Sequence, residues 1–260
     1  MSLKLLVFDS GIGGLSVLKE IRRRVPAAEI VYVADDAAFP YGDWEDGPLE
    51  AHVVATIGRL IERHEPEAVV IACNTASTLV LPALRARHAI PFVGTVPAIK
   101  PAAETTQSGV IGVLSTPGTM RRDYTRELIR NFARTCHVRL VGSSELAPLA
   151  EAAMRGEAVD DDAIRTEIEP AFIEVEGRRT DRIVLACTHY PFLLDRLAVL
   201  APWPVDWIDP ADAIARRVVS VLGLDEAPDG ARAPGEAFLT TGRTWPDALK
   251  PVLARFGLST

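Results

Sequence analysis

The sequence lacks the features that mark membrane proteins, secreted proteins and nucleic-acid-binding proteins. No apolar run approaches the roughly 20 residues that span a bilayer, and the opening Met1–Phe8 meets acidic Asp9 too early for a signal peptide. Acidic residues outnumber basic ones, 35 to 28, which gives a net charge of -7. This balance argues against a phosphate backbone or an anionic membrane surface as the main partner. We therefore expect a cytoplasmic protein with no nucleic acid as its main partner and no membrane.

Cysteine is scarce as well. The three cysteines, Cys73, Cys136 and Cys187, cannot all pair within one chain. None lies in the close Cys-x-x-Cys spacing that suggests zinc or a redox motif, so we expect no metal site. Free thiols are the default state in a reducing compartment.

Apolar strand-like runs alternate with helical patterns along the 260 residues, 48% of which are hydrophobic. This alternation is typical of a parallel sheet that is covered on both faces. The first unit is expected to contain a strand over 3–8, a tight turn over 9–14 and a helical stripe from Leu15 to Val25 that ends before Pro26. Further strands are expected at 30–33, 68–72, 92–96, 110–114, 138–141 and 183–186.

The length suits one large α/β unit or two lobes, and we favour two lobes. A helix over 98–105 is expected to lead into the second lobe, where Ile164 to Val175 carry the pattern of one long amphipathic helix. A helix over 211–222, opened by Asp209 and Pro210, is expected to return the chain to the first lobe, and 223–235 to form an exposed connection.

Two distant segments echo each other. Residues 69–75 and 183–189 are both apolar strands that end in Ala-Cys and continue with polar residues, and 7–11 more faintly resembles 113–118. We therefore expect two pseudo-symmetric three-layer α/β/α lobes with mainly parallel sheets and an active site in the cleft between them. The expected first lobe is 1–97 plus 208–260, carrying Cys73, and the second is 98–207, carrying Cys187.

The two matched cysteines stand where chemistry is expected. Small ligands bind beyond the carboxyl ends of the strands in open α/β sheets, and the positive end of a helix there favours thiolate over thiol. Neighbouring Asn74, Thr75 and Thr188 can cap helices and also bind a carboxylate. The simpler interpretation of any one cysteine is a small core residue. Two in matched settings weaken that interpretation, whereas Cys136 has no such motif and is interpreted as structural.

Four motifs carry a resemblance to a known family. They are Asp9-Ser10-Gly11-Ile12-Gly13-Gly14, Pro40-Tyr41-Gly42, Cys73-Asn74-Thr75-Ala76-Ser77-Thr78 and Cys187-Thr188-His189-Tyr190-Pro191. In order and spacing, they closely resemble the glutamate racemase family. The last motif favours glutamate over the related aspartate and hydantoin racemases.

The resemblance implies a cofactor-independent racemase that interconverts L- and D-glutamate and supplies D-glutamate for peptidoglycan. No metal and no pyridoxal phosphate are implied, the substrate is a small molecule, and a homodimer is expected. Inversion of an α-carbon requires proton removal on one face and delivery on the other, which two opposed acid–base groups can perform. By this resemblance, Cys187 deprotonates L-glutamate and Cys73 deprotonates D-glutamate.

The resemblance also implies helper residues, each of which has an ordinary alternative. Asp9 would assist Cys73, although Asp before Ser-Gly often only caps backbone N–H groups in a turn. His189 would assist Cys187, or instead cap a helix or lie in the core. Glu151 would act with His189, or instead be a solvated helix carboxylate. It matches a family pattern in 148–151, but the preceding 145–147 departs from that family's Ala-Cys-Pro run.

A larger set of polar residues and glycines is implied to bind the two substrate carboxylates. These are Asp9, Ser10, Tyr41, Gly42, Asn74, Thr75, Thr116, Thr119, Thr188 and His189. A plain turn is the alternative for Tyr41 and Gly42, and helix capping is the alternative for Thr116 and Thr119. The neighbouring Trp44-Glu45-Asp46 departs from the family, which usually has a basic residue there.

Two other function classes compete with a racemase. Gly11, Gly13 and Gly14 follow the first strand, where a glycine-rich turn can bind a dinucleotide, but Ser16 occupies the third glycine position of that fingerprint. A non-catalytic binding module is the second alternative, because some members of such families inhibit DNA topoisomerase. The intact Cys73 and Cys187 argue against it.

Overall fold

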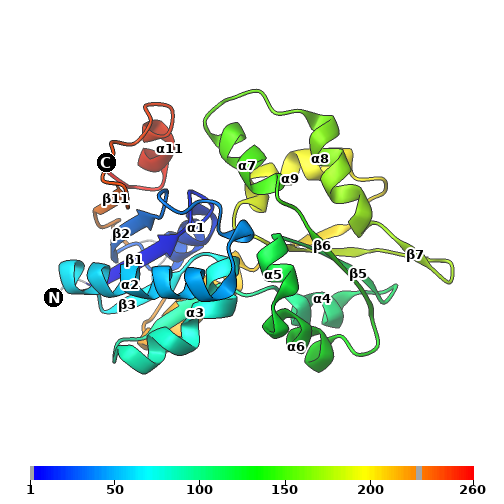
Figure 1. Ribbon diagram of the computed structural model, residues 1–260, viewed down its shortest axis with the longest axis horizontal. Coiled ribbons are helices and arrows are strands. Elements are labelled where there is room, and N and C mark those ends of the chain that lie inside the picture. The colour runs from blue at the N-terminus through cyan, green and yellow to red at the C-terminus, as the bar shows by residue number, and fades with distance from the viewer. Residues whose placement is uncertain (1–2, 227–229) are drawn as a thin grey trace. The chain divides into compact units, whose positions relative to one another are not determined.

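The structure is a computed structural model that describes residues 3–226 and 230–260 (Figure 1). Residues 1–2 and 227–229, including part of the expected connection 223–235, lie outside the described residues. The chain divides into two compact units, Met1–Thr95 with Ala211–Thr260, and Val96–Pro210. The sequence placed these boundaries at residues 97 and 208. Across the described ranges, no helix is both long and apolar enough to cross a membrane.

The first unit is built on a five-stranded sheet in which all neighbouring strands run parallel. In spatial order the strands are β11 (Gly235–Leu239), β2 (Glu29–Ala34), β1 (Lys4–Asp9), β3 (Ala68–Ile71) and β4 (Phe92–Gly94). Strands β1, β2 and β3 are almost continuously buried. This is the pattern of a parallel sheet with both faces covered.

Helices cover both faces of this sheet. The helix α2 (Asp46–His64) and the helix α3 (Asn74–Arg87) share one core cluster with Leu6 and Phe8 of β1. Leu5 and Val7 are equally buried but belong outside this cluster, because side chains alternate along a strand. The helices α1 (Leu15–Arg24) and α10 (Ala211–Leu222) pack against each other, and α10 packs on β4. The short helices η1 (Tyr41–Asp43) and α11 (Lys250–Arg255) complete the unit.

The second unit contains a four-stranded parallel sheet in the order β10 (Asp206–Ile208), β9 (Arg182–Ala186), β5 (Val110–Ser115) and β6 (His137–Gly142). One face packs on α4 (Ile99–Thr105) and α6 (Asp123–Phe132). The other packs on α7 (Leu146–Met154), α8 (Asp161–Ile168) and α9 (Leu194–Leu200). The remaining elements are α5 (Pro117–Arg121), η2 (Glu169–Ala171), η3 (Tyr190–Leu193) and the hairpin β7 (Glu174–Val175) with β8 (Arg178–Arg179).

The two sheets have equivalent strand orders. Strand β1 lies between β2 and β3, and β5 lies between β6 and β9. Cys73 follows β3 and Cys187 follows β9, so the segments that echo each other in the sequence occupy equivalent strands. The expected α/β class with two alike, mainly parallel sheets is confirmed.

The prediction of one long amphipathic helix that reaches Val175 is wrong. Helix α8 ends at Ile168, and Pro170 lies in the following 3-10 turn. Proline has no N–H to continue an α-helix and its ring clashes with the preceding turn. Gly177 then adopts a φ of 74°, and the chain reverses to pair β7 with β8.

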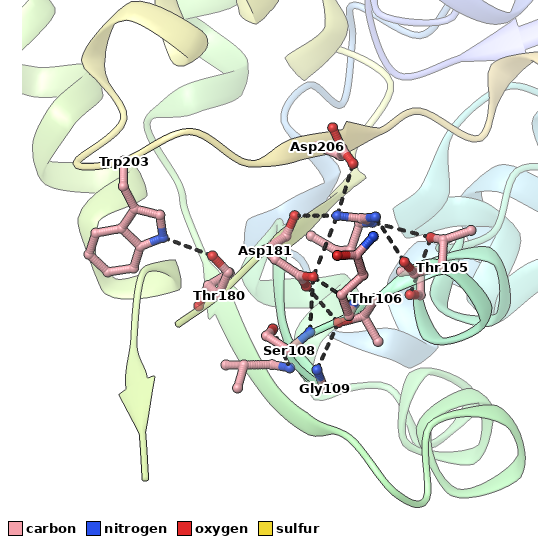
Figure 2. A network of polar contacts seen from close by, with 12 residues as sticks. Thr105, Thr106, Ser108, Gly109, Thr180, Asp181, Trp203 and Asp206 are labelled. Carbon is pink, nitrogen blue, oxygen red and sulfur yellow. Dashed lines mark hydrogen bonds and ion pairs between the residues drawn. The ribbon is translucent and has the colours of Figure 1, made fainter. Parts of the chain in front are cut away.

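Asp181 lies at the amino-terminal edge of the second sheet and is the centre of a polar network there (Figure 2). Its carboxylate accepts hydrogen bonds from the Thr106 hydroxyl at 2.5 Å and from the Gln107 and Ser108 N–H groups at 2.7 and 3.1 Å. Burial opposes its charge, but these hydrogen bonds outweigh burial and lower the pKa of Asp181. Arg182 next to it pairs with Asp206 at 2.8 Å. The amino edge is thus tied by a polar network, and Cys187 stands at the opposite end of β9.

Arg22 fastens the C-terminal segment to the first sheet. It lies on α1 and is 3% exposed. Its guanidinium donates to carbonyl oxygens of three chain segments, namely those of Pro26, Ala28, Ala233, Pro234 and Gly257. Burial, followed by the charge of Arg232, lowers its pKa to about 10, so the group stays charged at neutral pH.

Replacing Arg22 with methionine should lower the free energy of unfolding by about 3 kcal/mol, because several buried carbonyl groups lose their donor. Arg23→Met on the same helix is the matched control. Its exposed guanidinium forms ion pairs with Glu20 and Asp212 at the surface, so the loss should stay below about 1 kcal/mol. Urea unfolding followed by circular dichroism measures both, and equal midpoints would contradict the anchoring role.

Candidate active site

Polar residues form a row along the carboxyl edge of the first sheet. Thr240 follows β11, Asp35 follows β2, Asp9 ends β1, Cys73 comes two residues after β3, and Thr95 follows β4. Backbone hydrogen bonds continue across this edge, from Asp35 N to Asp9 O at 2.8 Å and from Thr240 N to Ala34 O at 3.1 Å. Residues far apart in the sequence therefore lie along one edge of the sheet, the edge that also carries the Cys73 thiol.

Cys73 is the N-cap residue of α3, with extended φ and ψ of -139° and 120°. It is 5% exposed, and its Sγ lies 3.9 Å from Ser10 Oγ. The positive end of a 14-residue helix at this position favours the thiolate. Asn74 and Thr75 form the first turn of α3 and are both buried.

Asp9 is fully buried, and its Oδ2 accepts a hydrogen bond from Gly14 N at 2.8 Å. The capping role that the sequence left open is thus present. A Cβ on Gly14 would lie 2.9 Å from Asp9 Cβ and 3.1 Å from Tyr32 Oη. Close packing against Asp9 and Tyr32 therefore accounts for this glycine without a dinucleotide.

The second unit surrounds its cysteine with side-chain partners. Cys187 Sγ lies 3.7 Å from His189 Nδ1, and His189 Nε2 lies 3.1 Å from Glu151 Oε1 on α7. Arg155 pairs with the other Glu151 oxygen at 3.5 Å. When Nε2–H donates to the carboxylate, Nδ1 presents its lone pair to the thiol. Glu151 is thus mostly buried against His189, not a solvated helix carboxylate.

The two thiols differ in their surroundings. Cys187 is not at a helix start, because η3 begins at Tyr190 with His189 as its N-cap and is only four residues long. The expectation that both cysteines lie at helix N-termini therefore holds for Cys73 alone. A backbone dipole acts at Cys73, and an imidazole stands beside Cys187.

The other predicted binding residues divide between the units. Ser10 lies with Asp9 and Cys73, while Thr188 is buried next to Cys187. Thr116 caps α5 by accepting from Thr119 N at 3.2 Å, so these two residues have the capping role that was their alternative. Substrate binding by these residues stays a prediction.

Two buried tyrosines accompany the cysteines. Tyr41 and Gly42 lie in η1, and the Tyr41 hydroxyl donates to Asp35 Oδ2. The Tyr190 hydroxyl donates to Ser115 O at 3.0 Å. Burial, and next the neighbouring Cys187, raise the pKa of Tyr190 well above its usual value. Sequence reasoning missed Asp35 as a partner of Tyr41, although its position directly after a buried strand was a usable signal.

In the part of the chain that the structure describes, no group of three or more His, Cys, Asp or Glu residues is arranged to hold a metal ion.

Known proteins resemble this chain in sequence and in fold. A family profile described as Asp/Glu/Hydantoin racemase matches residues 6–218. A glutamate racemase of Sinorhizobium medicae is 57% identical over 256 residues, covering 98% of this chain and 94% of the relative. The crystal structure of Escherichia coli glutamate racemase with L-glutamate and the activator UDP-MurNAc-Ala is 41% identical, with a TM-score of 0.89 over 99% of this chain and 96% of that one. Isoform RacE1 from Bacillus anthracis is 25% identical, with a TM-score of 0.79 over 99% and 96%.

These similarities extend over both units and both cysteine motifs. The chain is thus an amino-acid racemase, an isomerase. It belongs to the glutamate racemases of the Asp/Glu/Hydantoin racemase family.

Replacing His189 with asparagine should slow the alkylation of Cys187 by iodoacetamide about tenfold near neutral pH, because Nδ1 no longer accepts the thiol proton. Peptide mapping by mass spectrometry reads both thiols in the same sample, so Cys73 is an internal control. Equal slowing at both cysteines, or none at Cys187, would show that the imidazole does not activate this thiol.

Proposed function

We propose that the chain interconverts L- and D-glutamate without a cofactor, by a 1,1-proton transfer in which Cys73 and Cys187 are the two acid–base groups. One observation carries the proposal: each of two alike units places one cysteine just beyond the end of an equivalent buried strand. Glutamate as the substrate is supported by the 57% identical relative and by the L-glutamate in the Escherichia coli structure.

The chemistry explains why two thiols are needed. The α-proton of an amino acid is very weakly acidic, and inversion removes it from one face and delivers another proton to the opposite face. One thiolate takes the α-proton and becomes a thiol, while the other thiol gives its proton to the carbanion and becomes a thiolate. Starting from L-glutamate, Cys187 removes the α-proton and Cys73 delivers its proton to the opposite face. The reverse reaction exchanges these roles and restores both groups.

Each thiol requires an environment that tolerates both of its protonation states. At Cys187, His189 can hold the thiol proton and Glu151 stabilises the resulting imidazolium across 3.1 Å. At Cys73, the N-terminus of α3 stabilises the thiolate, and Asp9 on the neighbouring strand assists the proton transfer. The two halves thus use different means for the same task.

Substrate binding is assigned to hydroxyl, amide and backbone groups. Ser10, Tyr41, Gly42, Asn74 and Thr75 would serve from the first unit. Thr116, Thr119, Thr188 and His189 would serve from the second. Glutamate carries two carboxylates, one on the α-carbon and one on its side chain. Both need hydrogen-bond donors close by, because the chain as a whole carries a net charge of -7.

The proposal also includes the biological setting. The lobes would be 1–97 with 208–260, and 98–207, each carrying one of the two cysteines. A cytoplasmic homodimer would supply D-glutamate for peptidoglycan, and thereby serve cell wall biogenesis and cell shape.

Incubation of the protein with L-glutamate in D2O, with no added cofactor, should abolish the optical activity of the solution. Because different groups take and give the proton, early D-glutamate should carry deuterium at the α-carbon while the remaining L-glutamate is still protonated. Circular dichroism and proton NMR follow the two events.

Early deuteration of the L-glutamate would point to a single base instead. Unchanged optical activity with glutamate bound, measured by calorimetry, would favour a binding module over an enzyme.

Cys73→Ser and Cys187→Ser should each lower the rate of racemisation about 1000-fold while leaving the fold intact, because each removes one acid–base group in a nearly isosteric change. Cys136→Ser is the matched control, since this half-buried cysteine precedes β6 away from both strand ends. Optical assays started from each enantiomer measure the rates. Full turnover in both directions by either of the first two variants would end the two-base assignment.

A further inference from the structure

A buried carboxylate joins three segments of the first unit. Asp35 is fully buried just after β2. Its Oδ2 accepts from the Tyr41 hydroxyl and lies 2.6 Å from His52 Nε2, and its Oδ1 accepts from the Thr240 hydroxyl at 2.5 Å. These partners come from η1, from α2 and from the end of β11. We refer to Asp35, Tyr41, His52 and Thr240 as the Asp35 cluster.

Tyr41 connects this cluster to Cys73. The tyrosine is 1% exposed and shares a core cluster with Cys73. Its 3-10 turn packs against α3, whose N-cap is Cys73. Burial, and next the Asp35 carboxylate, raise the pKa of Tyr41 above its usual value, with Cys73 and Asp9 acting in the same direction. The phenol therefore keeps its proton and donates a hydrogen bond to Asp35 at neutral pH.

The other two members of the Asp35 cluster, His52 and Thr240, are fixed by contacts of their own. The His52 ring lies against Trp44, with ring centroids 5.5 Å apart. Thr240 is fixed through its N–H on Ala34 O, and the next residue, Thr241, donates to Asp36 from both its N–H and its hydroxyl, at 3.0 and 2.6 Å. The Asp35 carboxylate thus has fixed partners on both of its oxygens.

Burying a carboxylate is costly unless donors surround it, so a cluster of this kind specifies one arrangement of its members. Strands β2 and β11 are already linked by their ladder and by the Thr240 hydroxyl on Asp36 at 3.3 Å. The hydroxyl of Tyr41 adds a contact that extends in the other direction along the sheet edge, toward Asp9 and Cys73. Through this Tyr41 contact, the Asp35 cluster is connected to the proposed reaction at Cys73.

We propose that Asp35, oriented by His52 and Thr240, is a positioning residue for the Cys73 half of the racemisation. It holds the Tyr41 hydroxyl and so fixes a ring that belongs to the same core cluster as Cys73. The inference rests on the proposed function, and Asp35 itself neither takes nor gives the substrate proton. Loss of the constraint should act on orientation, where a displacement of about 1 Å can cost about 100-fold in rate.

Asp35→Asn keeps the shape but places an amide where a carboxylate oxygen accepts from its donors. It should lower kcat about tenfold while KM changes less than about twofold, since orientation is lost and not binding. Iodoacetamide should alkylate Cys73 about fivefold faster, because the loosened ring exposes the thiol, and alkylation of Cys187 should stay unchanged.

Two further pairs of variants make the test independent of one substitution. Thr240→Val removes the hydroxyl and should shift kcat and the Cys73 rate in the same directions, whereas Thr240→Ser retains the hydroxyl and should restore both. His52→Ala should act likewise, and His64→Ala is its control, because His64 lies on the same helix but contacts Phe238 and not Asp35. If Asp35→Asn fails to fold, these four variants decide the question.

An unchanged kcat and an unchanged Cys73 alkylation rate in Asp35→Asn would overturn the proposal. So would equal acceleration at both cysteines together with a lower melting temperature, which would mark a merely structural cluster. Should the wild-type protein not racemise glutamate, the proposed function fails on its own. The ratio of Cys73 to Cys187 alkylation would then decide whether Asp35 positions the thiol.

Discussion

The structure depends on one constraint, that parallel strands carry all their carboxyl ends to the same edge of a sheet. Burial of the apolar strands fixes their order, and that order decides which strand-end residues become neighbours. In the first sheet, Asp9 at the end of β1 stands between Asp35 and Cys73. In the second, Ser115 at the end of β5 stands between Cys187 and Ser143. The packing of the whole sheet thus fixes the position of each thiol, and this packing is far more extensive than the contacts of the thiol itself.

Within this shared plan, the two halves differ in how charge is managed. Cys73 has the N-terminus of a helix and the Asp9 side-chain carboxylate on the next strand. Cys187 has His189, Glu151 and Arg155, a chain of side chains in hydrogen-bonding or ion-pairing distance. The helix dipole is a fixed partial charge, whereas the imidazole can itself take up the thiol proton.

Local patterns were enough for most of the strands and for the cysteine motifs, but not for β7, β8 or β11. The buried run that ends at Cys73 and the run that ends at Cys187 stand out because both are apolar, short and followed by polar residues. Partners at long range were not predictable in this way, since Asp35, His52 and Thr240 meet only once β11 has joined the sheet beside β2. The helix expected to reach Val175 failed because apolar spacing was given more weight than Pro170 and Gly177.

The edge strand β11 shows how stability and chemistry are linked. Arg22 holds the chain on both sides of it, through the carbonyl groups of Ala233, Pro234 and Gly257, and Thr240 at its other end bonds to Asp35. Strand β11 pairs with β2 and is bridged by Ser259, and as an edge strand it depends on such attachments more than a central strand does. If Asp35 positions Tyr41, the geometry beside Cys73 rests on a segment at the far end of the sequence. The C-terminal segment then completes the first half of the site as well as its sheet.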